Sequence, residues 1–227
     1  MCTNYTPTAR EQIESMRLGV GPLPDATWAP EAFPGYLAPL VLSDAAGQAN
    51  RCVLARFGLV PRWSKDAKTA TDIARHTYNA RSETVAEKPS YRSPWRERHY
   101  ALAPMRNFFE PCWEDAGAHG GKSERWRISV ADGQPFAAAA LWERWTDPAS
   151  AEIVTSFTLI TVNAQADPVM RRMHGLGDEK RSIVIVAPAD YQAWLHATPA
   201  QATALLRRES VAALLGEPAP RKVQGLI

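Results

Sequence analysis

Short apolar runs separated by turn-forming residues dominate the hydrophobic pattern of this chain. Runs of this length that are rich in β-branched and aromatic residues predict strands. Helical patterns do not alternate regularly with them, so we expect an α+β fold with a mostly antiparallel, barrel-like or sandwiched β-sheet core and a few flanking helices. The predicted strands cover residues 37–42, 52–60, 100–105, 125–130, 136–145, 153–163 and 182–187.

Helical signals lie near the two ends of the chain. Residues 8–11 have the Thr-x-x-Glu pattern of a capping box, which predicts a helix that runs to about Leu18. Residues 190–197 have a helical apolar pattern. Thr198 followed by Pro199 predicts the start of a further helix, because proline is favoured at the first helical position.

Length and composition are those of an ordinary globular protein. The 227 residues are 45% hydrophobic, enough to bury a core without a disulfide or a structural metal. No repeat or low-complexity linker interrupts them, so we expect a single domain over residues 1–227. No run approaches the roughly 20 apolar residues of a membrane span. We therefore expect a cytoplasmic monomer with no membrane partner.

The cysteines and histidines exclude some chemistry. The three cysteines form no C-x-x-C pair, and the five histidines show no pair four residues apart around a glutamate. Neither a zinc site nor another cofactor is therefore expected. No G-x-S-x-G pattern supports a serine hydrolase.

Positive charge is concentrated in one segment, although the whole chain carries a net charge of only +2. Residues 51–106 contain twelve basic and five acidic side chains. Clustered cations of this kind bind phosphate backbones or form a solvated surface. Trp63, Tyr78, Tyr91 and Trp95 lie among the charges, as residues that stack on unpaired bases would.

Cys2 is notable for its position directly after Met1. Removal of Met1 would leave Cys2 with a free α-amine and a thiol, groups that titrate near ~8 and ~8.5. An amine and a thiol on adjacent carbons condense with an aldehyde to a five-membered thiazolidine. Cys2 is therefore a candidate nucleophile.

A set of recognisable motifs is spread over most of the chain. They are Cys2, residues 57–63 (FGLVPRW), 78–84 (YNARSET), 108–110 (FFE) and 134–137 (QPFA), the strand at 159–161 (LIT), and His174 before the last apolar strand. Together these motifs resemble the SOS response-associated peptidase (SRAP) family of abasic-site processing proteins. The Asn-Ala-Arg-x-Glu-Thr string combined with a cysteine at position 2 is specific.

The resemblance implies a protein that traps abasic sites in single-stranded DNA through Cys2, after autocatalytic loss of Met1. It makes Glu110 the proton-transfer group beside the α-amine, His174 the acid/base that opens the deoxyribose ring, and Asn79 an orienting group. A histidine that titrates near neutrality suits that step. The residues expected to contact DNA are Asn4, Arg62, Trp63 and Arg81.

The chain departs from the family pattern at three places. Many members begin Met-Cys-Gly-Arg, whereas Thr3 and Asn4 follow Cys2 here, so a cation often assigned to DNA contact is absent. Pro111 replaces a common aromatic residue. His174 is followed by Gly-Leu-Gly in place of an Asp-Arg-Met-Pro type of sequence.

Two other functions fit part of the pattern. An N-terminal-nucleophile cysteine peptidase would use Cys2 on polypeptides, and its activity would not depend on DNA. A non-catalytic single-stranded DNA-binding module would use only the basic segment. It would bind intact and abasic strands equally, with strong salt dependence.

Overall fold

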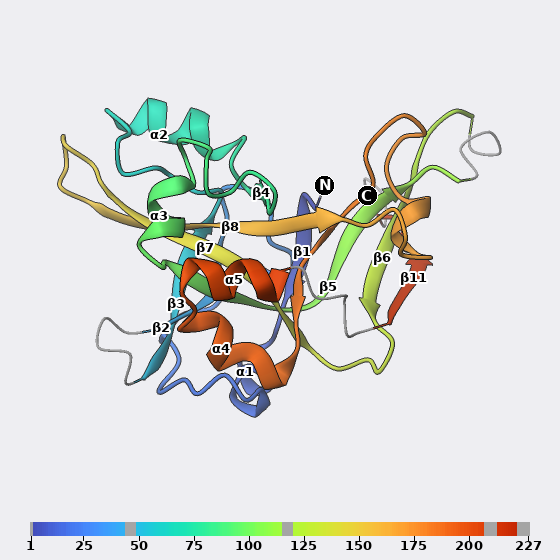
Figure 1. The fold of residues 1–227 in the computed structure, drawn as a ribbon, viewed down its shortest axis with the longest axis horizontal. Helices are drawn as coiled ribbons and strands as arrows, with labels where there is room; N and C mark the ends of the chain where they lie inside the picture. The colour runs from blue at the N-terminus through green and yellow to red at the C-terminus, as the bar shows by residue number, and fades with distance from the viewer. Residues whose placement is uncertain (1, 44–48, 115–119, 207–212, 222–227) are drawn as a thin grey trace, which may run out of the picture.

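A closed β-barrel of five strands forms the centre of the protein (Figure 1). The computed structural model describes residues 2–43, 49–114, 120–206 and 213–221. The barrel strands follow the order β7-β8-β3-β2-β5, and β5 pairs back onto β7. All neighbours are antiparallel except β3 and β8. This confirms the predicted α+β class and barrel-like core. The barrel strands are β2 (Leu37–Ser43), β3 (Asn50–Phe57), β5 (Tyr100–Cys112), β7 (Phe136–Thr146) and β8 (Ile153–Asn163).

Short strands extend the sheet beyond the barrel strands β5, β7 and β8. β1 pairs antiparallel with β5 and places Asn4 opposite Phe109, so Cys2 and the start of β1 lie near Glu110. β6 also pairs with β5, and β11 pairs with β6, while β4, β9 and β10 attach to β8 or β7. These strands are β1 (Asn4–Pro7), β4 (Asn79–Arg81), β6 (Glu124–Val130), β9 (Arg181–Ile183), β10 (Ile185–Val186) and β11 (Leu214–Pro218).

Short helices cover the barrel. Figure 1 shows α4 and α1 below the barrel and α2 above it. No described helix is long and apolar enough to cross a membrane. The helices are α1 (Arg10–Ser15), α2 (Ala67–Ala74), α3 (Arg92–Arg96), α4 (Tyr191–Leu195) and α5 (Pro199–Leu206), with 3-10 turns η1 (Met170–Arg172) and η2 (Pro188–Asp190).

Strand β7 is buried on both faces. Successive side chains of a strand point to opposite faces. Accordingly, Ala138 and Ala140 belong to the apolar cluster that contains Phe57, whereas Ala137 and Ala139 belong to a second cluster around Trp194 of α4. Small residues at these positions allow the helix layer to lie close to the barrel.

The predicted first helix is wrong in its start and its extent. Helix α1 covers only Arg10–Ser15, and its N-cap is Ala9, which makes no side-chain cap. Thr8 is fully buried, and its backbone N–H donates to Pro104 O (3.2 Å). The hydrogen bond to β5 therefore fixes the position of Thr8, and Thr8 does not cap the helix. The start of α5 is confirmed: Gln201 N–H donates to Thr198 Oγ1 (3.4 Å).

Candidate functional site

Cys2 lies two residues before the start of β1 and its side chain is buried. Its Sγ donates to Asn4 O (3.5 Å). Burial raises the pKa of the thiol well above its ordinary value, and the negative charge of Glu110 adds to the rise; hydrogen bonds with the backbone of Asn4 and Phe109 act in the opposite direction. The thiol is therefore held in its neutral form.

Asn79 connects strand β4 to Cys2. Its side-chain Nδ2 donates to Cys2 O (2.7 Å), and its own main-chain oxygen accepts a hydrogen bond from the hydroxyl of Tyr91 (3.0 Å). The parallel register with β8 places Asn79 opposite Leu159. The Asn-Ala-Arg string thus forms a short strand whose first side chain fixes the backbone of the candidate nucleophile.

Glu110 and His174 form a buried pair. Glu110 Oε2 lies 3.1 Å from His174 Nε2, and the two residues are 2% and 6% exposed. Glu110 comes from β5, and its charge acts on Cys2. A carboxylate and an imidazole are the side chains that general acid–base catalysis most often uses, and here the two lie close together.

The segment that carries His174 follows η1 and docks on the end of β5. His174 N–H donates to Pro111 O (2.8 Å), and Met173 forms a β-bridge with Cys112. His174 itself has φ +62°, in the left-handed region that non-glycine residues rarely adopt. Its side chain is thereby brought back toward Glu110. The structure thus unites all four predicted catalytic residues, from four separate parts of the chain.

Two further residues at the site were assigned no catalytic role from the sequence. Lys180 is buried, and its Nζ donates to three consecutive carbonyl oxygens, those of Met173, His174 and Gly175. Lysine is normally exposed, so no sequence signal marks it. Tyr78 is partly buried, and burial, together with the negative charge of Glu110, raises the pKa of its phenol. Its place next to Asn79 was the available signal.

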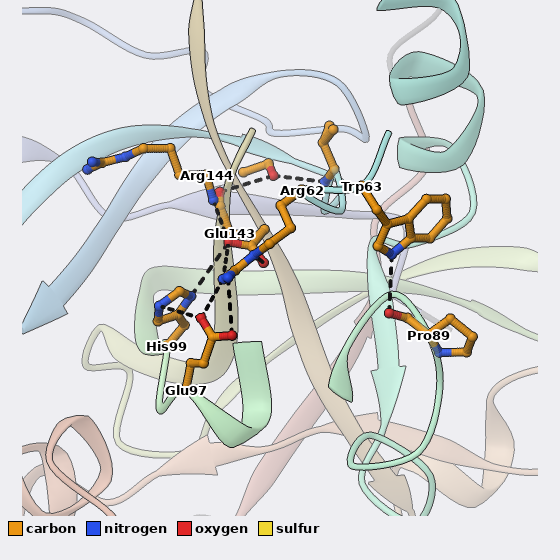
Figure 2. A network of polar contacts seen from close by, with 9 residues as sticks. Arg62, Trp63, Pro89, Glu97, His99, Glu143 and Arg144 are labelled. Carbon is orange, nitrogen blue, oxygen red and sulfur yellow. Dashed lines mark hydrogen bonds and ion pairs between the residues drawn. The ribbon is translucent and has the colours of Figure 1, made fainter. Parts of the chain in front are cut away.

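Trp63 and Arg62 lie side by side but in different settings (Figure 2). Trp63 is 52% exposed, and its Nε1 donates to Pro89 O (3.4 Å). Arg62 donates two hydrogen bonds to the buried carboxylate of Glu143 (2.9 and 3.0 Å) and two to Glu97 (3.1 and 2.6 Å). Its charge is balanced by these carboxylates, whereas the Trp63 ring is open to a ligand.

His99 completes the network around Glu143 (Figure 2). Its Nδ1 lies 3.7 Å from Glu143 Oε1, and its ring stacks on Trp142 with centroids 4.5 Å apart. Burial lowers the pKa of His99, which favours its neutral form, although the carboxylates of Glu143 and Glu97 oppose this.

The other two residues assigned to DNA contact have protein partners. Arg81 is half-exposed, and its Nη1 lies 2.8 Å from Glu179 Oε2. Asn4 is buried, and its Nδ2 donates to Glu31 (2.9 Å). Arg81 can exchange its exposed partner for a phosphate, whereas the Asn4 amide is already occupied.

The aromatic residues of the basic segment do not share one role. Tyr91 and Trp95 are buried and pack in the core, so the prediction that they stack on bases is wrong for these two. Trp63 alone of the four is strongly exposed. In the part of the chain that the structure describes, no group of three or more His, Cys, Asp or Glu is placed to hold a metal ion.

The barrel and its Cys2-centred site define the class of protein. Residues 1–224 match the profile of the SRAP family, described as SOS response associated peptidase, and the chain belongs to this family. The expected family resemblance is thereby confirmed.

Individual relatives carry a common name. The abasic site processing protein YoqW of Bacillus subtilis (strain 168) is 31% identical over 150 residues, which are 66% of this chain and 59% of that protein. The abasic site processing protein HMCES of Gallus gallus is 26% identical over 148 residues, 56% of this chain and 41% of that protein. The chain thus matches less than two thirds of the length of these curated relatives.

A solved structure shares the whole fold. A crystal structure of a protein from Bordetella bronchiseptica superposes with a TM-score of 0.83 at 26% identity, and the match covers 97% of this chain and 100% of that one.

Proposed function

We propose that the protein senses abasic sites in single-stranded DNA and forms a covalent thiazolidine crosslink with them through Cys2, after removal of Met1. The observation that carries the proposal is the convergence of Asn79, Glu110 and His174 on Cys2. The names of the relatives YoqW and HMCES support the abasic site as the target.

Removal of Met1 is the first step of the proposal. Cys2 Sγ attacks the carbonyl carbon of Met1, the peptide C–N bond breaks as the nitrogen takes up a proton, and water hydrolyses the resulting thioester. The products are free methionine and a Cys2 with both an α-amine and a thiol. Glu110, whose negative charge acts on Cys2, accepts the thiol proton in this step.

Ring opening comes next, because an abasic deoxyribose is mainly a closed hemiacetal. His174 takes the proton of the C1′ hydroxyl, the C1′–O4′ bond breaks, O4′ receives a proton and C1′ becomes an aldehyde. Glu110, 3.1 Å away, compensates the charge that the imidazole gains.

Crosslinking then joins three groups. The α-amine adds to C1′, and the addition product loses water to give an iminium ion. Cys2 Sγ then adds to the same carbon, loses its proton and closes the thiazolidine. Asn79 holds the Cys2 carbonyl, and thus the orientation of both nucleophiles, during these steps. Removal of a C2′ proton from the iminium ion, with breakage of the C3′–O bond and departure of the 3′ phosphate, would give strand cleavage as a side reaction.

The DNA contacts of the proposal use two solvent-exposed side chains. Trp63 stacks on a base next to the abasic site, and Arg81 binds a backbone phosphate. Arg62, held by two carboxylates, orients the adjacent Trp63.

A denaturing gel tests this function. The protein is incubated with a single-stranded oligonucleotide that has one abasic site, and a heat-stable adduct is expected. Cys2→Ala should abolish the adduct, whereas the matched variant Cys52→Ala, at a buried cysteine on the barrel strand β3, should keep it. Intact mass should show that Met1 is absent from the reactive protein. An adduct that persists in Cys2→Ala would refute the mechanism.

A further inference from the structure

Lys180 fixes the backbone around His174. Its Nζ donates to the main-chain oxygens of Met173 (2.8 Å), His174 (3.1 Å) and Gly175 (2.8 Å). An ammonium group has three N–H donors, so these three carbonyls use all of them. Because Lys180 is 8% exposed, its charge is removed from most solvent, and only complete hydrogen bonding makes that position favourable.

The segment that Lys180 binds is strained at His174. A φ of +62° is unfavourable for a residue with a Cβ atom, and it persists only where the surroundings impose it. The curled backbone turns three successive carbonyl oxygens toward one cation. It also directs the imidazole to Glu110. The ammonium therefore binds the conformation that forms the Glu110–His174 pair.

The position of Lys180 is itself set by the barrel. Its main-chain oxygen accepts a hydrogen bond from Ala164 N–H (2.8 Å), just beyond β8. The next residue, Arg181, is buried and begins β9; its guanidinium donates to Thr161 O (2.8 Å) and pairs with Glu83 (2.8 Å). Lys180 thus links the segment that carries His174 to the end of β8.

We propose that Lys180 is a positioning residue for His174 in the opening of the abasic sugar ring. It does not touch the substrate. It holds His174 Nε2 against Glu110, so that the imidazole reaches the C1′ hydroxyl in the orientation for proton transfer. This inference rests on the proposed function, since it assigns His174 to that step.

Three variants isolate this role. Lys180→Met keeps the length of the apolar stem and removes the three donors and the charge. Lys180→Arg restores a charged donor group at the same place. Lys122→Met, at an exposed lysine before β6, is the matched control for the loss of one positive charge. If Lys180→Met does not fold, Lys180→Gln, which keeps two donors without the charge, takes its place.

Two DNA strands separate ring opening from the later steps. One carries a natural abasic site. In the other, the abasic nucleotide is replaced by an acyclic linker that bears an aldehyde and no hydroxyl able to close a ring. Lys180→Met should crosslink the natural site about 10- to 100-fold more slowly in single-turnover experiments, the range expected for a misplaced catalytic group. It should crosslink the acyclic aldehyde within about threefold of the unaltered rate, as should Lys180→Arg and Lys122→Met on both strands.

The outcomes distinguish the positioning role of Lys180 from the proposed function. Equal slowing on both strands, or no slowing on the natural site, overturns the positioning role. No adduct from the unaltered protein on either strand overturns the proposed function instead. The imidazole NMR resonances of His174 are then compared in the absence of DNA: a shift in Lys180→Met supports the anchoring, and unchanged resonances refute it.

Discussion

The side-chain amide of Asn79 donates a 2.7 Å hydrogen bond to the main-chain oxygen of Cys2, and so joins β4 to the start of the chain. In Asn79→Ala the backbone of Cys2 loses this restraint. We expect the single-turnover crosslinking rate to fall by about 10- to 100-fold, because small errors of orientation are costly at a reacting centre. The free energy of unfolding should fall by only about 1 kcal/mol, the usual net value of one hydrogen bond. Asn79→Asp, which has the same shape but no donor, should be equally slow; an unchanged rate in both would contradict the role of Asn79.

The titration of Cys2 should depend on Glu110. Burial and the Glu110 carboxylate both raise the pKa of the thiol. Glu110→Gln removes the negative charge, so the thiolate becomes less unfavourable and the pKa should move down, toward its ordinary value. The pH dependence of Cys2 alkylation by iodoacetamide, followed by mass spectrometry on chains with the same N-terminus, measures this shift. Cys52, whose pKa burial raises to about 11, serves as an internal control and should titrate alike in both proteins. An upward shift at Cys2 would contradict the assignment.

Trp63 should contribute to DNA affinity without contributing to stability. Its ring is 52% exposed, so Trp63→Ala removes little packing. Stacking of a base on an aromatic side chain is worth about 1–3 kcal/mol, and we expect a loss of affinity for single-stranded DNA in that range. Fluorescence anisotropy measures the affinity and thermal unfolding the stability. Ile153→Ala, at an exposed apolar residue on β8, should leave the affinity unchanged.

Arg62 should contribute chiefly to stability. Arg62→Met leaves the carboxylate of Glu143 buried without its two guanidinium hydrogen bonds. We expect a loss of about 1–3 kcal/mol in the free energy of unfolding, less than for a fully buried pair because Arg62 is 42% exposed. The double variant Arg62→Met/Glu143→Gln should recover part of that loss in urea unfolding, since it removes the uncompensated charge. If the losses measured for Arg62→Met and for Glu143→Gln alone simply add in the double variant, the two residues are not coupled.

Gly58 should not tolerate a side chain. It has φ +111°, and a Cβ atom there would lie 2.5 Å from Ala74 O. Gly35 has φ +96° and open space around the Cβ position, so Gly35→Ala measures the conformational cost alone, about 1–2 kcal/mol. Gly58→Ala should lower the free energy of unfolding by about 2 kcal/mol more, because backbone in the core must also shift. Equal losses in urea unfolding would show that the close contact relaxes freely.

The barrel strands were predictable because their apolar runs are β-rich, although β5 was predicted only over residues 100–105 and continues to Cys112. Strand β8 was predicted over its full length, and β7 to within one residue. The predicted strand at 52–60 extends beyond β3, which ends at Phe57 because Gly58 turns the chain. Strands β4 and β11 escaped prediction because they are short and form only by pairing with distant segments.

The residues of the candidate site were predictable from the sequence, whereas the residues that hold them in position were not. Cys2, Asn79, Glu110 and His174 were identified by motif, and the structure brings them together. The partners that hold them come from sequence positions with no motif. Lys180 is such a case, because a buried lysine looks like any surface lysine until the fold places carbonyl oxygens around it. The partners of Arg62 and Asn4 were likewise set by tertiary contacts.

The pairing of β1 with β5 also determines when the chemistry can begin. Cys2 and the groups around it lie far apart along the chain: Asn79, Glu110, His174 and Lys180 follow it by 77 to 178 residues. An incomplete barrel therefore offers a cysteine without the groups assigned to its chemistry. Under the proposed function we expect crosslinking to appear only with the closed barrel, so that folding itself sets the onset of the activity.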